Sequence, residues 1–343
     1  VVGSRAQEVL TLDDCLRWGI ENNLSLRGQR NEIQKSKYAI SENRAKLLPQ
    51  INGVANFNDN FDPPVSVTDG SAYDKPYNVT QTLQYNAAAG LQLQMPLYNQ
   101  TVYTALSISK VLDEISRLSY EKAREDLMMQ IAKMYYLGQA TAEQITLVKA
   151  NIARLEELRD ITVAFYDNGM AMEVDVKRVN INLENLQVQY DNAQAMLAQQ
   201  LNMLKYVMDY PAEKDITLEP VNAETIAPIE LTGLSENLYE LQLLQSKSDL
   251  AERQKKMISH GYIPSLTLTG NWMYTAYTDK LHHWFHSGPS NHWYRSYGLG
   301  LALRVPIFDG LDKRYKIRKA KIDLENIRLA QENTRKNLET QYV

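Results

Sequence analysis

Four segments of this chain alternate between apolar and polar residues with a period of two, which predicts strands with one apolar and one polar face. They cover residues 49–58, 84–96, 263–275 and 295–306. Strands of about 10–12 residues match the length that a tilted strand needs to cross a bilayer. The apolar positions include Phe57, Tyr85, Leu91, Leu93, Trp272, Tyr274, Leu301 and Leu303, and the polar positions include Asn52, Asn56, Gln92, Gln94 and Arg304.

Two arrangements fit this alternation. The strands form either a soluble sheet with one buried face or a transmembrane barrel with apolar side chains toward lipid and polar side chains toward a water-filled lumen. Aromatic residues near the predicted strand ends favour the barrel, because such residues form girdles at the membrane interface. Arg304 is expected in the lumen or at the interface, since a lipid-facing arginine at the midplane costs about 2–4 kcal/mol. Four strands cannot close a barrel, so the barrel requires strands from other subunits.

The rest of the chain follows helical periodicity. A helix is predicted over 12–47, with Thr11 as its N-cap and Pro49 beyond its end. A long helical hairpin is predicted over 99–208, with a turn at 166–169. In its second arm ten positions are spaced 3-4-3-4 and nine of them are apolar, which indicates a coiled coil. A helix of about 65 residues spans roughly 100 Å, which suits a tube or a filament better than a globular domain.

The order of these elements is repeated. Leu48-Pro49-Gln50-Ile51 has its counterpart at Ile263-Pro264-Ser265-Leu266, and the segment 90–98 resembles 300–308. The first repeat covers 1–230 and ends in a linker over 209–230. The second repeat covers 231–343, with predicted helices at 232–260 and 309–343. The barrel portion comes from 49–97 and 263–306, and the fold class is mainly α with a β-barrel portion.

Composition narrows the function further. The formal net charge of −4 gives no electrostatic reason to expect nucleic acid. The single cysteine, Cys15, excludes a disulfide within the chain and is expected to pack in an amphipathic stretch. The first residues do not have the pattern of a signal peptide or a lipoprotein anchor. No run of apolar residues is long enough for a transmembrane helix.

The sequence contains none of the common catalytic motifs. The sequence has no phosphate-binding glycine loop, nucleophile elbow or metalloprotease helix, so neither an enzyme nor a cofactor is expected. Four histidines cluster in one loop: His282, His283, His286 and His292. Asp279 is the only nearby carboxylate, so a solvated aromatic loop is favoured over a metal site. The segment 59–82 is interpreted as the equivalent loop of the first repeat.

The motifs together resemble the TolC family of outer-membrane efflux proteins. Leu10-Thr11-Leu12-Asp13-Asp14 with Glu21-Asn22-Asn23-Leu24 resembles the opening of that family. The two Leu-Pro or Ile-Pro strand starts and the strand-to-helix junctions at 95–99 and 305–310 resemble it too. The resemblance covers nearly the whole chain. It implies a homotrimer with a 12-stranded barrel in the outer membrane of a Gram-negative envelope and a coiled-coil tunnel in the periplasm.

The resemblance also implies partners and sites. The chain would be a passive exit duct for efflux or type I secretion, surrounded by outer-membrane lipid. A periplasmic adaptor would dock on the helical tip and connect it to an inner-membrane RND or ABC transporter. The tip residues are Asn168, Gly169, Met170 and Ala171. Asp175 aligns with the family's gate aspartate, although an acid in a first helical turn is also stabilised by the helix dipole.

One departure and two alternatives remain. By analogy with the first repeat, a second hairpin would need about 75 residues more than 309–343 provide, so either the chain is incomplete or the tunnel is built differently. The chain could instead be a coiled-coil scaffold with a small β-domain, which fractionation would reveal as soluble without detergent. It could also be a metal-dependent enzyme that uses the histidine loop, which tightly bound stoichiometric zinc would indicate.

Overall fold

The structure is a computed structural model that describes residues 8–69, 77–220, 238–282 and 293–341. The chain divides into two compact units. One unit contains residues 1–35, 114–244 and 332–343, and the other contains residues 36–113 and 245–331. The first is called the helical unit and the second the sheet unit, and each is described separately.

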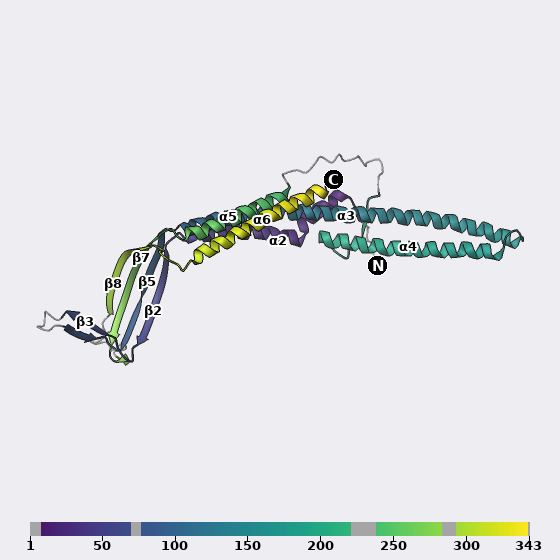
Figure 1. The fold of residues 1–343 in the computed structure, drawn as a ribbon. Helices are drawn as coiled ribbons and strands as arrows, with labels where there is room; N and C mark the ends of the chain where they lie inside the picture. Colours follow the sequence, from purple (N-terminus) through teal and green to yellow (C-terminus); the bar gives the residue numbers. More distant parts are fainter. Residues whose placement is uncertain (1–7, 70–76, 221–237, 283–292, 342–343) are drawn as a thin grey trace. The chain divides into compact units, whose positions relative to one another are not determined.

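The sheet unit is built on four antiparallel strands (Figure 1). Their order is β2-β5-β7-β8, so the two repeats meet where β5 pairs with β7. The bounds are Gln50–Asp59 for β2, Tyr85–Tyr98 for β5, Ser265–Thr278 for β7 and Trp293–Arg304 for β8. The sheet has no further strand beyond β2 or β8 in the described part of the chain.

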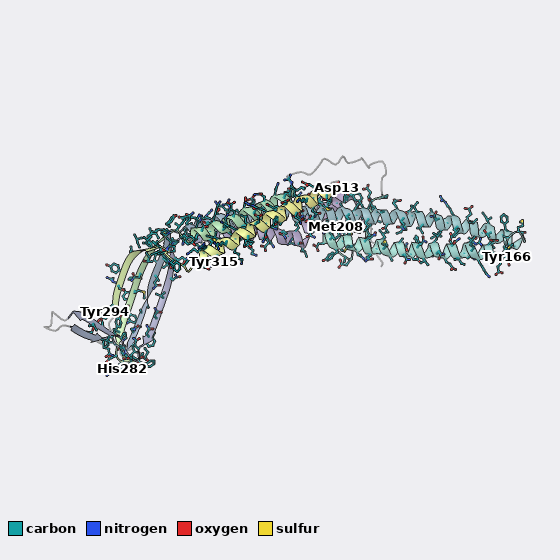
Figure 2. All side chains as sticks on the ribbon, in the orientation of Figure 1. Asp13, Tyr166, Met208, His282, Tyr294 and Tyr315 are labelled. Atoms are coloured by element: carbon teal, nitrogen blue, oxygen red, sulfur yellow. The ribbon has the colours of Figure 1, made fainter. Side chains whose placement is uncertain are left out.

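Four helix segments adjoin one end of this sheet. The helices are α2 (Leu24–Ala45), α3 (Gln100–Asp167), α5 (Tyr239–His260) and α6 (Asp312–Gln341). Because Gln50 pairs with Gln94 and Ser265 pairs with Arg304, all four strand-to-helix junctions lie at the same end of the sheet. We call this the junction end. Figure 2 shows Tyr315 beside it and His282 at the opposite end.

Local chemistry fixes these junctions. Pro49 and Pro264 precede β2 and β7, and a proline cannot continue the helix before it. Asn99 begins α3 by accepting a hydrogen bond at its Oδ1 atom from the backbone N–H of Thr101, at 3.1 Å. Asp309 does the same before α6, where its carboxylate accepts from the backbone N–H of Leu311, at 3.2 Å.

The helical unit has a buried core. It is formed by α1 (Leu12–Asn22), part of α3, α4 (Glu173–Met208) and a short parallel pair of strands, β1 (Glu8–Leu10) with β6 (Ile216–Leu218). Cys15, Ile131, Leu204 and Met208 are fully buried there. Burying such side chains contributes about 1.5–3 kcal/mol each.

The predicted single helix over 12–47 is wrong in one respect, because the chain breaks at Asn23. Its ψ angle of 122° is not helical. The Asn23 side chain accepts from the backbone N–H of Leu26 at 2.9 Å and donates to the carbonyl of Val207 at 2.9 Å. Asparagine is a favoured N-cap, so it ends α1 and begins α2 in one step.

One side of α4 in the helical hairpin is sheltered from solvent. α3 lies alongside α4 over the length of α4 (Figure 1). All ten heptad positions of α4, from Val176 to Val207, are buried or half-buried, whereas most residues between them are exposed. Gly169 closes the turn at a φ of 73°, a left-handed angle that glycine adopts without strain.

Two short strand pairs were not predicted. The predicted linker over 209–230 is wrong for 216–218, which form β6 and pair with β1. The predicted loop over 59–82 contains a hairpin of β3 (Val65–Asp69) and β4 (Tyr77–Gln81). Strands of three to five residues carry too few positions for a period of two to stand out. Among the described residues, no helix combines the length and the apolar character that crossing a bilayer requires.

Candidate functional site

The sheet presents one apolar face. Strand register places Leu91 opposite Trp272, Trp272 opposite Tyr297, and Leu268 opposite Leu301. The predicted apolar positions therefore share one face across all four strands: Phe57, Tyr85, Leu91, Leu93, Trp272, Tyr274, Leu301 and Leu303. Most of them are exposed, and Leu299 beside them is 79% exposed. Among the described residues, this face is covered only at the end opposite the junctions, where Ala276 and Thr278 are buried.

The apolar face is hollowed at Gly270. The hollow has a volume of about 510 Å³ and is lined mainly by Ile51, Leu91, Leu93, Trp272, Tyr297 and Leu299. Gly270 lies between Leu93 and Leu299, whose side chains are within 3.3 Å of where a Cβ atom would be. Trp272 lies in the middle of β7 and not near its end, because the strand extends to Thr278.

The opposite face is polar. Asn52 pairs with Gln92, Gln50 with Gln94, and Gln92 with Asn271, so these side chains share it with Asn56. Near the end opposite the junctions, the Asn58 amide donates to the Asn86 carbonyl oxygen at 2.9 Å. Arg304 is also on this face, but at the last position of β8, at the junction end. Its position is thus a strand end and not the centre of the sheet.

Three glycines lie on the polar face at positions where a side chain would press against β7. Gly298 and Gly300 face Asn271 and Thr269, each with a side-chain oxygen 3.2 Å from where a Cβ atom would lie. A Cβ atom at Gly90 would collide with the backbone of β7 at Trp272 and Met273. No side chain can be added at Gly90 without moving that strand.

The helical tip lies in the helical unit. Asn168, Gly169 and Met170 are exposed, and Ala171 is half-buried. Figure 2 labels Tyr166 beside this turn. The Asn168 amide donates to the carbonyl of Ala164 at 2.7 Å, and the backbone N–H of Met170 donates to the carbonyl of Phe165 at 2.8 Å. These bonds hold the turn in one shape and leave the Met170 side chain, 69% exposed, in solvent.

Asp175 has local contacts in this chain. Its carboxylate accepts from the backbone N–H of Met172 at 3.2 Å, which caps the start of α4. Arg178 lies 3.9 Å away on the next turn of the same helix. Both contacts are ordinary for an acid in a first helical turn.

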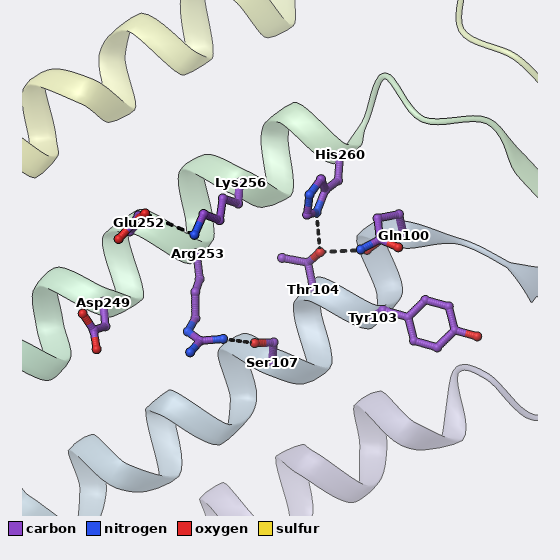
Figure 3. Close-up of a pocket in the computed structure, with 9 residues that line it drawn as sticks. All are labelled: Gln100, Tyr103, Thr104, Ser107, Asp249, Glu252, Arg253, Lys256 and His260. Atoms are coloured by element: carbon purple, nitrogen blue, oxygen red, sulfur yellow. Dashed lines mark hydrogen bonds and ion pairs between the residues drawn. The ribbon is translucent and has the colours of Figure 1, made fainter.

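A polar pocket of about 380 Å³ lies between α3 and α5 in the sheet unit (Figure 3). The Thr104 hydroxyl donates to the carbonyl of Gln100 at 2.8 Å and lies 2.7 Å from His260 Nδ1. Because its one proton is used on Gln100, the hydroxyl accepts from an Nδ1–H, which leaves His260 Nε2 unprotonated in the neutral ring. Arg253 contacts Ser107, and Glu252 pairs with Lys256 at 3.1 Å.

The sequence did not predict this pocket, because its residues come from two helices that are far apart in the sequence. Each looks like an ordinary position on a solvated helical face. Glu252 and Lys256 satisfy each other, and the Thr104 hydroxyl beside His260 donates its proton to the carbonyl of Gln100, so the side chains of this pocket are held by hydrogen bonds to one another.

The remaining candidates for chemistry are metal-ligating side chains and the single cysteine. Among the described residues, no group of three histidine, cysteine or acidic side chains could hold a metal ion. The histidine loop is described only at His282, and His283, His286 and His292 lie outside the described residues. Burial raises the pKa of the Cys15 thiol to about 11, and the nearby Asp14 carboxylate contributes to the rise. A thiol with that pKa stays protonated and unreactive.

Comparison with known proteins places this fold in a family. A family model described as outer membrane efflux protein matches residues 19–208. Outer membrane protein TolC of Vibrio cholerae is 24% identical over 301 residues, which cover 84% of this chain and 62% of the relative. The probable efflux pump outer membrane protein TtgC of Pseudomonas putida is 24% identical over 276 residues, covering 76% of this chain and 53% of that one.

Solved structures agree on the fold. The CmeC outer membrane channel of Campylobacter jejuni superposes with a TM-score of 0.74 at 18% identity, over 94% of this chain and 67% of that one. The chain thus spans between about half and three-fifths of the length of the curated relatives it matches. With more than half of its residues matched by the family model, the chain belongs to the outer membrane efflux protein family, the TolC-like proteins of the outer membrane.

Proposed function

We propose that this chain is part of the outer-membrane exit duct of a tripartite efflux or type I secretion system, a passive conduit that catalyses nothing. One observation carries the proposal: the sheet exposes a continuous apolar face and has two strand edges, β2 and β8, without a partner strand in the described part of the chain. Family membership supports it. Such a sheet is unfavourable in water, because exposed edges and apolar patches promote aggregation.

Membrane insertion satisfies both features together. Lipid covers the face that carries Leu91, Trp272 and Leu301, while water fills the lumen over the face that carries Asn52, Asn56, Gln92 and Gln94. Within hydrocarbon every backbone group needs a partner in the protein, so both edges have to be paired. The family resemblance implies three copies: with β8 of one copy paired to β2 of the next, the four strands of each chain would make a 12-stranded barrel.

The primary test measures assembly and conductance of the purified chain. We expect native mass spectrometry in detergent to give three copies, and planar bilayers to give stepwise ionic conductance. A chain that is monomeric and soluble without detergent would contradict the proposal and favour the coiled-coil scaffold. Full activity in a cell is expected only with the complete protein, because the chain matches part of the length of its relatives.

The hairpin tip is proposed as the contact for a periplasmic adaptor, which links the duct to an inner-membrane RND or ABC transporter. The exposed turn at 168–171 is small and rigid, which suits packing against a partner helix. Gly169 is a poor position to test, because its φ of 73° makes any substitution strained. Met170→Trp keeps the turn. In the complete protein it should abolish drug resistance and leave the trimer intact, and unchanged resistance would exclude the tip.

Asp175 is proposed as part of the periplasmic gate, through polar contacts to a neighbouring helix. The local cap on Met172 competes with that role. Asp175→Ala should raise single-channel conductance if the carboxylate restrains a closed tip. Glu173→Ala removes a neighbouring acid from the same turn and serves as the control. Equal conductance in both variants would leave Asp175 with the capping role alone.

A further inference from the structure

The start of α6 is strongly basic. Residues 309–322 contain six basic and two acidic residues, a net charge of +4 in a chain whose total is −4. The basic residues, called the basic segment, are Lys313, Arg314, Lys316, Arg318, Lys319 and Lys321. Lys313 and Arg314 lie in the first turn of the helix, where the macrodipole disfavours cations. The other four lie beyond that turn, where the macrodipole has little effect, so it does not explain why cations are concentrated here.

Exposed apolar residues directly precede the basic segment. Ile307 is 93% exposed and Phe308 is 82% exposed, in the short stretch between β8 and α6. Tyr315 is exposed beside the junction end (Figure 2). Apolar and aromatic side chains next to lysine and arginine are typical of a membrane-water interface. On the proposed function, the junction end is where the strands leave the membrane on the periplasmic side.

The four helix ends at this border enclose a groove of about 440 Å³. Val102, Ala105, Met257 and Ile258 give it an apolar lining, and Lys46, Lys313 and Lys316 bring three ammonium groups to it. Its size is in the range of small-molecule sites. Apolar groups beside cations complement a molecule with an anionic head and a hydrocarbon tail.

Acidic residues lie near the groove and pair with its lysines. Asp312 lines it and pairs with Lys316 at 2.7 Å, Asp309 pairs with Lys313 at 3.0 Å, and Glu42 pairs with Lys46 at 3.5 Å. The Lys316 and Lys46 pairs are solvent-exposed and therefore weak, so these lysines can also contact a phosphate, whereas the Lys313 pair is more sheltered. Within the described part of the chain, Arg314, Arg318, Lys319 and Lys321 form no ion pair, and these four supply the net charge of +4.

We propose that this groove and the basic segment bind an anionic phospholipid of the adjoining membrane leaflet. The phosphate lies against Lys46, Lys313 and Lys316, and an acyl chain lies along Val102, Met257 and Ile258. The inference rests on the proposed function only in placing the junction end at a membrane. An acidic protein segment would use the lysines but would gain little from the apolar lining next to Ile307 and Phe308.

The test is native mass spectrometry of the detergent-solubilised chain with added lipid. Phosphatidylglycerol is compared with phosphatidylcholine of the same acyl chains, and we expect clear preference for phosphatidylglycerol. The variant Lys46→Gln/Lys313→Gln/Lys316→Gln should weaken phosphatidylglycerol binding by about tenfold or more. The control Lys133→Gln/Lys149→Gln/Lys177→Gln removes the same charge from exposed positions of the helical unit and should bind as the wild type does.

Three further arms make the outcome decisive. If the triple variant fails to assemble, Lys46→Gln/Lys316→Gln leaves the more sheltered Lys313 pair in place and should still lose most of the preference. Val102→Ser/Ile258→Ser should weaken long-chain lipid and spare a short-chain analogue with the same headgroup. Full displacement by inorganic phosphate would indicate a free-anion site and overturn the proposal, as would displacement by an acidic peptide.

The result is independent of the duct itself. Equal binding of the two lipids by the wild type, or unchanged binding by the triple variant, would overturn the lipid site even if the chain conducts ions. A chain that prefers phosphatidylglycerol but does not conduct would support the lipid site and count only against the proposed function.

Discussion

The core of the helical unit and the sheet of the sheet unit use apolar residues in opposite ways. In the helical unit Ile131, Leu204 and Met208 are fully buried by their own chain. In the sheet unit Leu299, Leu301 and Leu303 are as apolar but lie exposed on one face. The first region completes its packing within one chain, whereas the second is complete only when lipid and neighbouring strands are present. Burial within one chain is thus a poor guide to which apolar residues matter.

The largest expected effect comes from the core. Leu204→Ala removes a fully buried side chain and should lower the free energy of unfolding by about 2–5 kcal/mol. Leu147→Ala makes the same change at a residue that is 66% exposed and should stay within about 0.5 kcal/mol. Urea unfolding followed by circular dichroism measures both. Both residues belong to the helical unit, so equal losses would mean that burial by the chain itself does not decide stability there.

The apolar face of the sheet should respond to charge. Leu299→Arg places a cation near the middle of β8 and should cost about 2–4 kcal/mol per chain in a bilayer. Asn271→Arg adds the same charge to the opposite face of the neighbouring strand and should be tolerated there. The fraction of chain assembled in lipid vesicles is the measurement. A larger loss for Asn271→Arg would reverse the assignment of the two faces.

The start of α1 offers a smaller effect within the helical unit. The Thr11 hydroxyl accepts from the backbone N–H of Asp14 at 3.2 Å, as one half of a capping box. Thr11→Ala should cost about 0.5–2 kcal/mol. Thr146→Ala, in the middle of α3, removes a hydroxyl that only bonds the carbonyl of Ala142 and should have little effect. Thermal unfolding of the two variants gives the comparison.

The smallest effect is a pH dependence. The hydrogen bond from the Thr11 hydroxyl, and then that from the Thr11 backbone, lower the pKa of the Asp14 carboxyl below its ordinary value. Its contribution to stability is therefore fully present above the ordinary carboxyl pKa and is lost as the pH falls through the lowered value. Asp14→Asn should flatten that part of the stability curve. If Asp14→Asn loses as much stability at low pH as the wild type does, the pH dependence comes from other carboxylates.

Much of the fold could be predicted because its patterns are long. Alternation over ten or more residues identified the four strands, and the shared face of Leu91, Trp272 and Leu301 follows from the register. The heptad spacing of α4 identified its sheltered side. The TolC-like fold followed from the duplicated order together with the motifs, and it agrees with the family and the solved structures.

The remainder depended on contacts that a local pattern does not contain. The break at Asn23 is fixed by a bond to Val207, which is distant in the sequence. The β1–β6 pair joins residues 8–10 to residues 216–218. The groove beside the basic segment draws its lining from four helices. The roles of the tip and of Asp175 remain predictions, because each depends on a partner that one chain does not supply.

The single junction end has a consequence for engineering this protein. Neighbouring strands within each repeat are joined at the other end by the segments 60–84 and 279–292, and neither segment leads into a helix. Extra residues inserted there, outside the paired strands β3 and β4, would leave the register of β2, β5, β7 and β8 and the adjoining helices unchanged. Affinity tags, fluorophores or foreign epitopes therefore belong in these two segments, and the cell surface is where the orientation proposed above would display them.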